Sequence, residues 1–141
     1  MGRLLRILST LTALLGAIAL GVPGAASAAP AAEIAHNTKS QYLTNRPTSG
    51  LPKSCVERRI SLATGRYDWA QQGGPGERLD LYLGAGWYAW KDCLEPRSGY
   101  YRHTTSLNPD NPDWQTIELR GDWKPAVAGP WTWGSYLDPR F

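Results

Sequence analysis

The chain has 141 residues, of which 15 are Lys or Arg, 12 are Asp or Glu and 7 are Trp, with only two cysteines. The formal net charge is only +3, and Lys and Arg cluster nowhere in the chain, which argues against a nucleic-acid partner. With two histidines and two cysteines, the chain also lacks the ligands for a zinc site of the His/Cys kind.

The N-terminal segment has the three parts of a secretory signal peptide. Arg3 and Arg6 form a basic region, an apolar run extends from 7 to 20, and Ala26-Ser27-Ala28 supplies a small-residue cleavage pattern. The competing interpretation is an uncleaved membrane anchor, but this run is shorter than the roughly 20 residues that a spanning helix needs. We expect residues 1–28 to be a signal peptide, and the mature protein to be secreted, extracellular and without a membrane span.

Cleavage also changes the charge of the chain. Loss of Arg3 and Arg6 leaves 13 basic residues against 12 acidic residues, because no acidic residue precedes Glu33. The sequence pI of about 9.0 therefore says little about partners.

The next segment, residues 29–53, is rich in Ala, Pro, Thr, Ser and Asn and has no hydrophobic period. This composition predicts a poorly ordered N-terminal arm, in which His36 is solvated. We expect a single disulfide-bonded β domain to follow over residues 54–141.

Two cysteines in an exported chain predict one disulfide, Cys55–Cys93. The competing role, a thiol nucleophile, requires a reduced cysteine and a histidine partner, and export disfavours it. Closure of a loop of this length stabilises the fold by about 4 kcal/mol in the chain-entropy treatment.

Three segments share a pattern: Ile60–Pro75, Leu81–Pro96 and Lys124–Pro139. They are aligned on the glycines at positions 65, 86 and 129. An aromatic residue stands two positions after the glycine and tryptophan stands four positions after it, while proline stands ten positions after it. The aromatic pairs are Tyr67 and Trp69, Tyr88 and Trp90, and Trp131 and Trp133. The recurrence indicates an internal strand–glycine–strand repeat.

Positions two and four after the glycine lie on the same face of an extended strand. We therefore expect Trp69, Trp90 and Trp133 to point into the core, with polar or small residues on the other face. Short strands punctuated by Gly and Pro predict an all-β fold, a small antiparallel β-sandwich or barrel. A three-fold prism or trefoil fits the uneven spacing of the copies poorly. Residues 115–123 look like a hairpin that turns at Gly121.

Trp87 stands between these inward positions, so strand parity predicts that it points outward. An exposed tryptophan favours a binding surface, although the N-terminal arm is an equally good cover for it.

Candidates for chemistry are few. His103, next to Thr105 and Ser106, is better interpreted as an exposed imidazole than as a catalytic base, because no nucleophile motif accompanies it. Glu95 and Asp138 occupy equivalent repeat positions, and each acid before a proline is typical of a turn rather than of a glycosidase pair. We expect no enzyme activity and no cofactor.

The segment Asn108–Asp113 has oxygen ligands at close spacing, which suggests calcium, but this spacing does not match an EF-hand loop. Its prolines favour a rigid turn instead.

The residues left for function are aromatic and polar, a mixture suited to sugar rings or to a protein partner. We expect a non-enzymatic secreted protein that binds an extracellular polysaccharide or the cell wall, with Trp87 at the centre of its site. The alternative is a secreted inhibitor or antagonistic protein that acts by protein–protein contact through the 106–114 loop. The candidate ligand-binding residues are Trp87, Tyr100, Tyr101, Arg102, His103 and Trp114.

Overall fold

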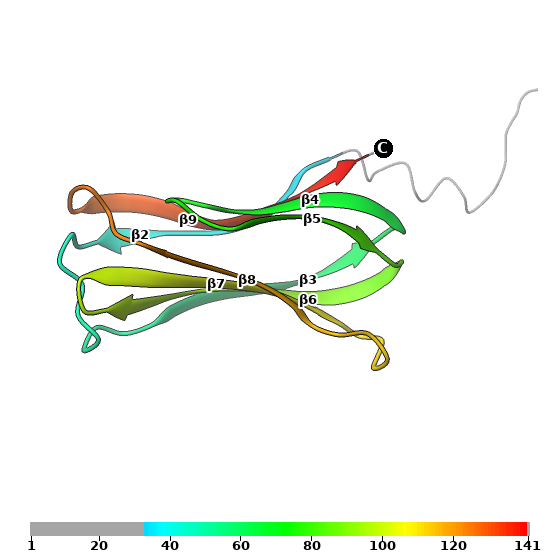
Figure 1. The fold of residues 1–141 in the computed structure, drawn as a ribbon, viewed down its shortest axis with the longest axis horizontal. Coiled ribbons are helices and arrows are strands. Elements are labelled where there is room, and N and C mark those ends of the chain that lie inside the picture. The colour runs from blue at the N-terminus through cyan, green and yellow to red at the C-terminus, as the bar shows by residue number, and fades with distance from the viewer. Residues whose placement is uncertain (1–32, 141) are drawn as a thin grey trace, which may run out of the picture. The chain divides into compact units, whose positions relative to one another are not determined.

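The computed structural model describes residues 33–140, which form two antiparallel four-stranded sheets packed face to face (Figure 1). The fold is an all-β sandwich, as the alternating pattern predicts. One sheet has the strand order β2-β9-β4-β5 and the other has the order β3-β6-β7-β8. The strands are β2 Ala35–Leu43, β3 Ser54–Leu62, β4 Gly65–Gln72, β5 Arg78–Leu83, β6 Gly86–Arg97, β7 Tyr100–Pro109, β8 Ile117–Trp123 and β9 Gly129–Arg140.

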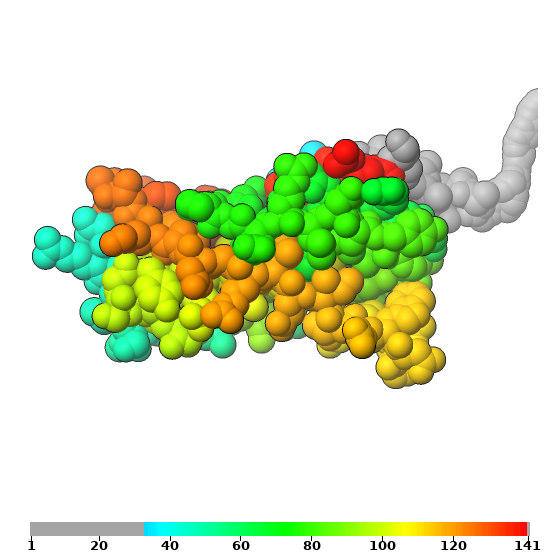
Figure 2. Space-filling model, in the orientation of Figure 1, coloured from blue at the N-terminus to red at the C-terminus, as the bar shows by residue number. Residues whose placement is uncertain are grey.

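The expected signal peptide, residues 1–28, lies outside the described residues. The space-filling view shows the described part as an elongated body, from which the segment between β7 and β8 projects at one end (Figure 2). No helix that could span a membrane occurs in the part of the chain that the structure describes.

The prediction of a poorly ordered arm was wrong for Ala35–Leu43, which forms the edge strand β2. This strand pairs antiparallel with β9 along its whole length, from Ala35 opposite Leu137 to Leu43 opposite Gly129. The segment has little hydrophobic periodicity because its inward positions include Asn37, which is buried and hydrogen-bonded rather than apolar. The β fold therefore begins well before residue 54.

The predicted disulfide is present between Cys55 and Cys93. The two residues are direct partners in the β3–β6 ladder, and their neighbours Asp92 and Leu94 are the residues that face the core. The bridge therefore lies on the outer face of one sheet, where it joins the edge strand β3 to the interior strand β6.

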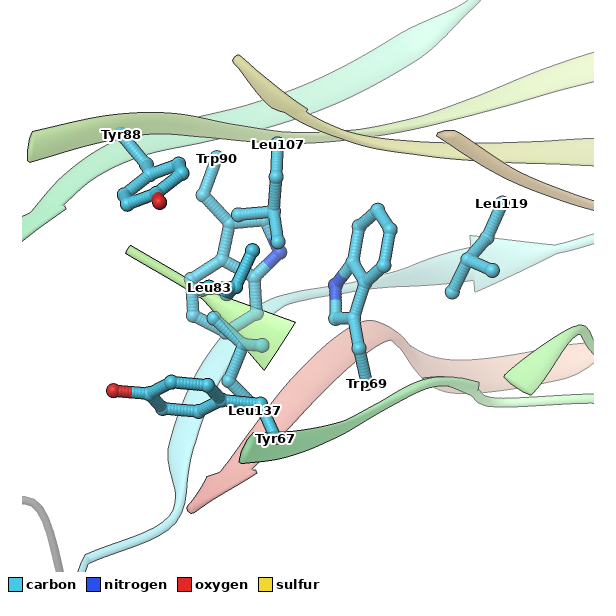
Figure 3. Packing of buried hydrophobic residues seen from close by; sticks show 8 residues of the cluster. All are labelled: Tyr67, Trp69, Leu83, Tyr88, Trp90, Leu107, Leu119 and Leu137. Carbon is cyan, nitrogen blue, oxygen red and sulfur yellow. The ribbon is translucent and has the colours of Figure 1, made fainter. Parts of the chain in front are cut away.

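The tryptophan column forms the core, as strand parity predicts. Trp69, Trp90 and Trp133 have no exposed surface. Trp69 and Trp90 belong to one hydrophobic cluster, in which their rings lie between the sheets (Figure 3). Trp133 belongs to a second cluster, with Leu94 and Trp123, toward the other end of the sandwich.

The two glycine turns after β3 and after β5 do not make hairpins. Each carries the chain from one sheet to the other, because β3 and β6 lie in one sheet while β4 and β5 lie in the other. The predicted hairpin at Gly121 was wrong, because Gly121 lies inside β8. A side chain at this position would collide with the amide of Gln71, which occupies the space that the glycine leaves.

Candidate functional site

An open cleft of about 430 Å³ lies at the end of the sandwich where β5 passes into β6. Its most exposed aromatic side chains are Tyr82, at the end of β5, and Trp114, in the segment between β7 and β8, which are 69% and 42% exposed. The remaining lining residues are Leu83, Gly84, Tyr88, Pro109, Asp113, Gln115 and Ile117.

The segment between β7 and β8 is held in a fixed shape by its own hydrogen bonds. The backbone amide of Trp114 donates to the carbonyl of Asn111 at 3.1 Å, and the amide of Asp113 donates to the Asn111 side-chain oxygen at 3.0 Å. At the base of the segment, the Thr116 hydroxyl donates to Asn108 Oδ1 at 2.9 Å. These Asx-type turns fix the backbone of the loop, so the Trp114 indole is held in position without a bound ligand.

Gly84 allows the Trp114 indole to pack against the turn between β5 and β6. A Cβ atom at this position would overlap the indole ring, so any larger residue would displace it. The Tyr88 hydroxyl donates to the Gly84 carbonyl at 2.7 Å, so a buried side chain also holds this turn in place. Burial, reinforced by the Coulombic interaction with Tyr67, raises the pKa of the Tyr88 phenol, which favours its neutral form.

The polar lining of the cleft consists mainly of Asp113 and Gln115. The cleft therefore combines aromatic faces with one carboxylate and one amide. Within residues 33–140, Asp113 makes no salt bridge, whereas Asp80 pairs with Arg66 and Asp110 pairs with Arg59.

Trp87 points outward as predicted, with 52% of its surface exposed, but it does not line the cleft. It lies on the outer face of the β3-β6-β7-β8 sheet, where the Arg59 guanidinium is 5.6 Å from the centroid of the Trp87 ring. Arg59 is itself held by Asp110, whose backbone amide donates to the Trp87 carbonyl at 2.9 Å. Ala35–Leu43, which belongs to the expected arm, pairs in the opposite sheet and leaves Trp87 exposed.

The expected flanks of Trp87 at residues 100–103 lie at the far end of the sheet. Arg102 pairs with Glu95, eight residues along β6 from Trp87, which corresponds to roughly 26 Å of strand. Tyr100 and Arg102 face outward, and Arg102 pairs with Asp122 at 3.2 Å. These residues therefore form no common surface with Trp87.

Tyr101 and His103 are not surface residues, contrary to prediction. Tyr101 is 3% exposed and packs with Trp123 and Trp133 in the second hydrophobic cluster. His103 is 1% exposed, and its Nε2 lies 2.7 Å from Asp92 Oδ1. Its neighbours on β7 alternate inward and outward, so His103 shares the inward face with Tyr101.

Six buried polar residues form a layer between the two hydrophobic clusters, which we name the polar layer. Its members are Asn37, Gln71, Asp92, His103, Thr105 and Ser135. They come from both sheets, so their hydrogen bonds cross the middle of the sandwich.

Asp92 is the centre of the polar layer. Its Oδ1 accepts hydrogen bonds from His103 Nε2 at 2.7 Å and from Thr105 Oγ1 at 2.5 Å. Its Oδ2 accepts from Asn37 Nδ2 at 2.9 Å and from Ser135 Oγ at 2.7 Å. An ionised carboxylate only accepts hydrogen bonds, so its contact with His103 requires a proton on Nε2 of the imidazole.

The polar layer resembles a serine–histidine–acid set in composition but not in geometry. The Ser135 hydroxyl donates to Asp92 rather than to His103, and it accepts from Trp90 Nε1 at 2.9 Å. The side chains are also closed to solvent. A hydroxyl that is buried and donates to the carboxylate instead of the imidazole cannot act as a nucleophile in this arrangement.

The sequence does carry a signal for the polar layer that the tryptophan pattern obscures. Position six after the repeat glycine, inward by the same parity as the tryptophans, holds Gln71, Asp92 and Ser135. A polar residue at an inward position of every copy indicates a hydrogen-bonded layer in the core.

Two further candidates are separated by the fold. Glu95 faces outward from one sheet and pairs with Arg97, whereas Asp138 lies on the outer face of the opposite sheet beside Asp68. Two carboxylates on opposite outer faces cannot act on one glycosidic bond. Among residues 33–140, no group of three or more His, Cys, Asp or Glu side chains is arranged to hold a metal ion.

The chain matches no known family model, no curated protein and no solved structure.

Proposed function

We propose that the protein is a secreted, non-enzymatic module that binds extracellular polysaccharide through the cleft between Tyr82 and Trp114. The observation that carries this proposal is the open cleft of about 430 Å³, which presents two exposed aromatic side chains beside a carboxylate and an amide. Large aromatic side chains are seldom left in water together without a partner.

The chemistry of the cleft suits a sugar ring. The apolar CH face of a pyranose stacks on an aromatic face, and its hydroxyl groups bond to carboxylate and amide oxygens. Asp113 and Gln115 supply these oxygens beside Trp114. Because the loop hydrogen bonds hold Trp114 in place, little ordering entropy opposes binding.

Trp87 takes a secondary role in this proposal. It follows Gly84, which contacts the Trp114 ring, by only three residues, so both tryptophans lie at the same end of the sandwich. Trp87 faces the outer surface of the sheet, while Trp114 faces the cleft. A polymer that leaves the cleft along this side meets a second aromatic surface, whereas a single sugar does not.

Retention on insoluble chitin, cellulose and peptidoglycan tests the proposal. Tyr82→Ala and Trp114→Ala should each lower affinity roughly 3- to 10-fold, the typical value of one aromatic stacking contact. Tyr42→Ala is the matched control, because Tyr42 is 72% exposed but lies at the opposite end of its sheet, beside Pro130. Trp87→Ala should weaken retention on polymers only.

All of these side chains are exposed, so the variants should keep the parent's melting temperature. Retention of the parent on none of the three polymers would refute the proposal. Equal losses for Tyr42→Ala and Tyr82→Ala would refute the location of the site. N-terminal sequencing of the exported protein tests secretion, and we expect the mature chain to begin at Ala29.

A second candidate function uses the same loop. The segment between β7 and β8 projects from the body and is internally hydrogen-bonded, which is the form of loop that an inhibitor presents to a protease (Figure 2). Inhibition of a protease at near-stoichiometric ratio, lost when residues 110–114 are replaced by glycine and serine, would favour this function over polysaccharide binding.

A further inference from the structure

We propose that the cleft selects glycans that carry protonated amino groups over neutral and acidic glycans. This inference rests on the proposed function and specifies the chemistry of the ligand. It follows from the charge of Asp113 and from the aromatic surfaces beside it.

Asp113 supplies an uncompensated negative charge to the cleft. Its carboxylate has no salt-bridge partner among residues 33–140, and none of the lining residues is Lys, Arg or His. The neighbouring carboxylates are already neutralised, since Asp110 is paired with Arg59 and Asp80 with Arg66. A ligand that enters the cleft therefore meets one net negative charge.

The aromatic side chains of the cleft favour the same ligand charge. The faces of Tyr82 and Trp114 carry the negative part of the ring quadrupole, which attracts an ammonium group and repels a carboxylate. The raised pKa of Tyr88 keeps its phenol neutral, so it adds no repulsion toward either kind of ligand. Asp113 and the aromatic faces thus act in the same direction.

The aromatic walls of the cleft decide which ammonium-bearing molecule fits. These walls are two exposed aromatic side chains on separate elements, and the partly buried Ile117 adds apolar surface, whereas Leu83 and Pro109 are buried. A sugar ring covers the aromatic faces and carries its amino group on the ring itself. A lysine side chain offers only a narrow stem, so an amino sugar fills the site better than a basic peptide does.

Calorimetry with three oligosaccharides of equal length tests the inference at mildly acidic pH and low salt: glucosamine, N-acetylglucosamine and uronic acid oligomers. We expect the glucosamine oligomer to bind roughly 3- to 10-fold more tightly than its acetylated counterpart, the combined effect of an exposed ion pair and a cation–aromatic contact. The uronic acid oligomer should bind most weakly. The preference should shrink as salt is added.

Asp113→Asn should lower the ratio of the two affinities, for the glucosamine and the N-acetylglucosamine oligomers, because the ion pair with the amine is lost while the cation–aromatic contact remains, and an unchanged ratio would overturn the role of Asp113. Glu57→Gln is the matched control, because it removes an exposed carboxylate on β3, a strand that contributes no residue to the cleft lining. This variant should keep the preference.

The outcomes separate this inference from the proposed function. Equal affinity for the amine and acetylated oligomers would overturn the inference and leave polysaccharide binding intact. No binding of any oligomer would overturn both. Tighter binding of a lysine-rich peptide than of the glucosamine oligomer, with loss in Asp113→Asn, would show that the acidic cleft serves a protein ligand instead.

Discussion

The substitution Asp92→Asn should destabilise the protein strongly although it changes no side-chain volume. Asp92 is fully buried, and its two oxygens accept four hydrogen bonds. An asparagine offers a single acceptor oxygen, and its NH₂ group faces two donors wherever it is placed. If the NH₂ group lies on the Oδ2 side, it meets the Asn37 amide and the Ser135 hydroxyl; on the other side, it meets His103 and Thr105.

The expected loss is about 3–5 kcal/mol. A hydrogen bond to a charged acceptor is worth about 1.5–3 kcal/mol, and two such bonds are lost. A change of the His103 tautomer recovers part of one bond, which keeps the sum near the lower end of the range. Since a domain of this size holds about 5–15 kcal/mol in total, the variant loses a large part of its stability.

Urea unfolding of parent and variant measures the effect. For a slope of about 2 kcal/mol per molar, the midpoint should fall by roughly 1.5–2.5 M. Asp122→Asn is the control, since it removes an exposed aspartate that pairs with Arg102 on the outer face, and it should cost at most about 1 kcal/mol. A midpoint for Asp92→Asn close to that of Asp122→Asn would refute the central role of Asp92.

Three further substitutions test the packing of the sandwich by the same unfolding assay. Trp90→Ala should cost about 3–5 kcal/mol, because the indole is fully buried in the first hydrophobic cluster; a parent-like midpoint would show that the column is not core. Replacing both Cys55 and Cys93 by alanine should cost about 4 kcal/mol, given a sequence separation of 38 residues, and an unchanged midpoint would contradict the loop-closure argument. Gly134→Ala should destabilise far more than Gly65→Ala, because Gly134 has a φ of 144° and its Cβ would collide with the Asn37 backbone, while Gly65 has open space around it; similar midpoints would argue against this clash.

The core could be predicted from the sequence because it is specified locally. Alternation within one strand decides which side chains face inward, so the burial of Trp69, Trp90 and Trp133 and the exposure of Trp87 require no knowledge of the partner strands. The disulfide was predictable for a different reason, since two cysteines allow only one pairing within the chain.

The cleft could not be predicted because it depends on distant contacts. Trp114 lies beside Gly84 only because β5 crosses between the sheets at the end where β7 finishes. Tyr82 alternates with apolar residues on its strand, and nothing local distinguishes it from other outward residues. The flanking role predicted for residues 100–103 failed for the same reason, because sequence proximity does not give position along a ladder.

Strand β2 escaped prediction because its pairing with β9 does not depend on its own apolar pattern. An edge strand needs hydrogen bonds on one side only, and a polar core position such as Asn37 hides the alternation on which sequence reasoning relies. The same polar core positions hid the function of Asp92 and Ser135 as links between the sheets.

The pairing of β2 with β9 determines how the protein responds to a mechanical pull. Ala35 lies opposite Leu137, so the two ends of the folded part leave the sandwich side by side. Force applied between these ends loads the β2–β9 ladder one rung at a time, from Ala35 toward Leu43, rather than all rungs together. The disulfide joins β3 to β6 in the other sheet and cannot share this load. When the protein is pulled by both ends, we therefore expect β2 to separate from β9 one hydrogen-bonded pair at a time, at a lower force than if all pairs were loaded together.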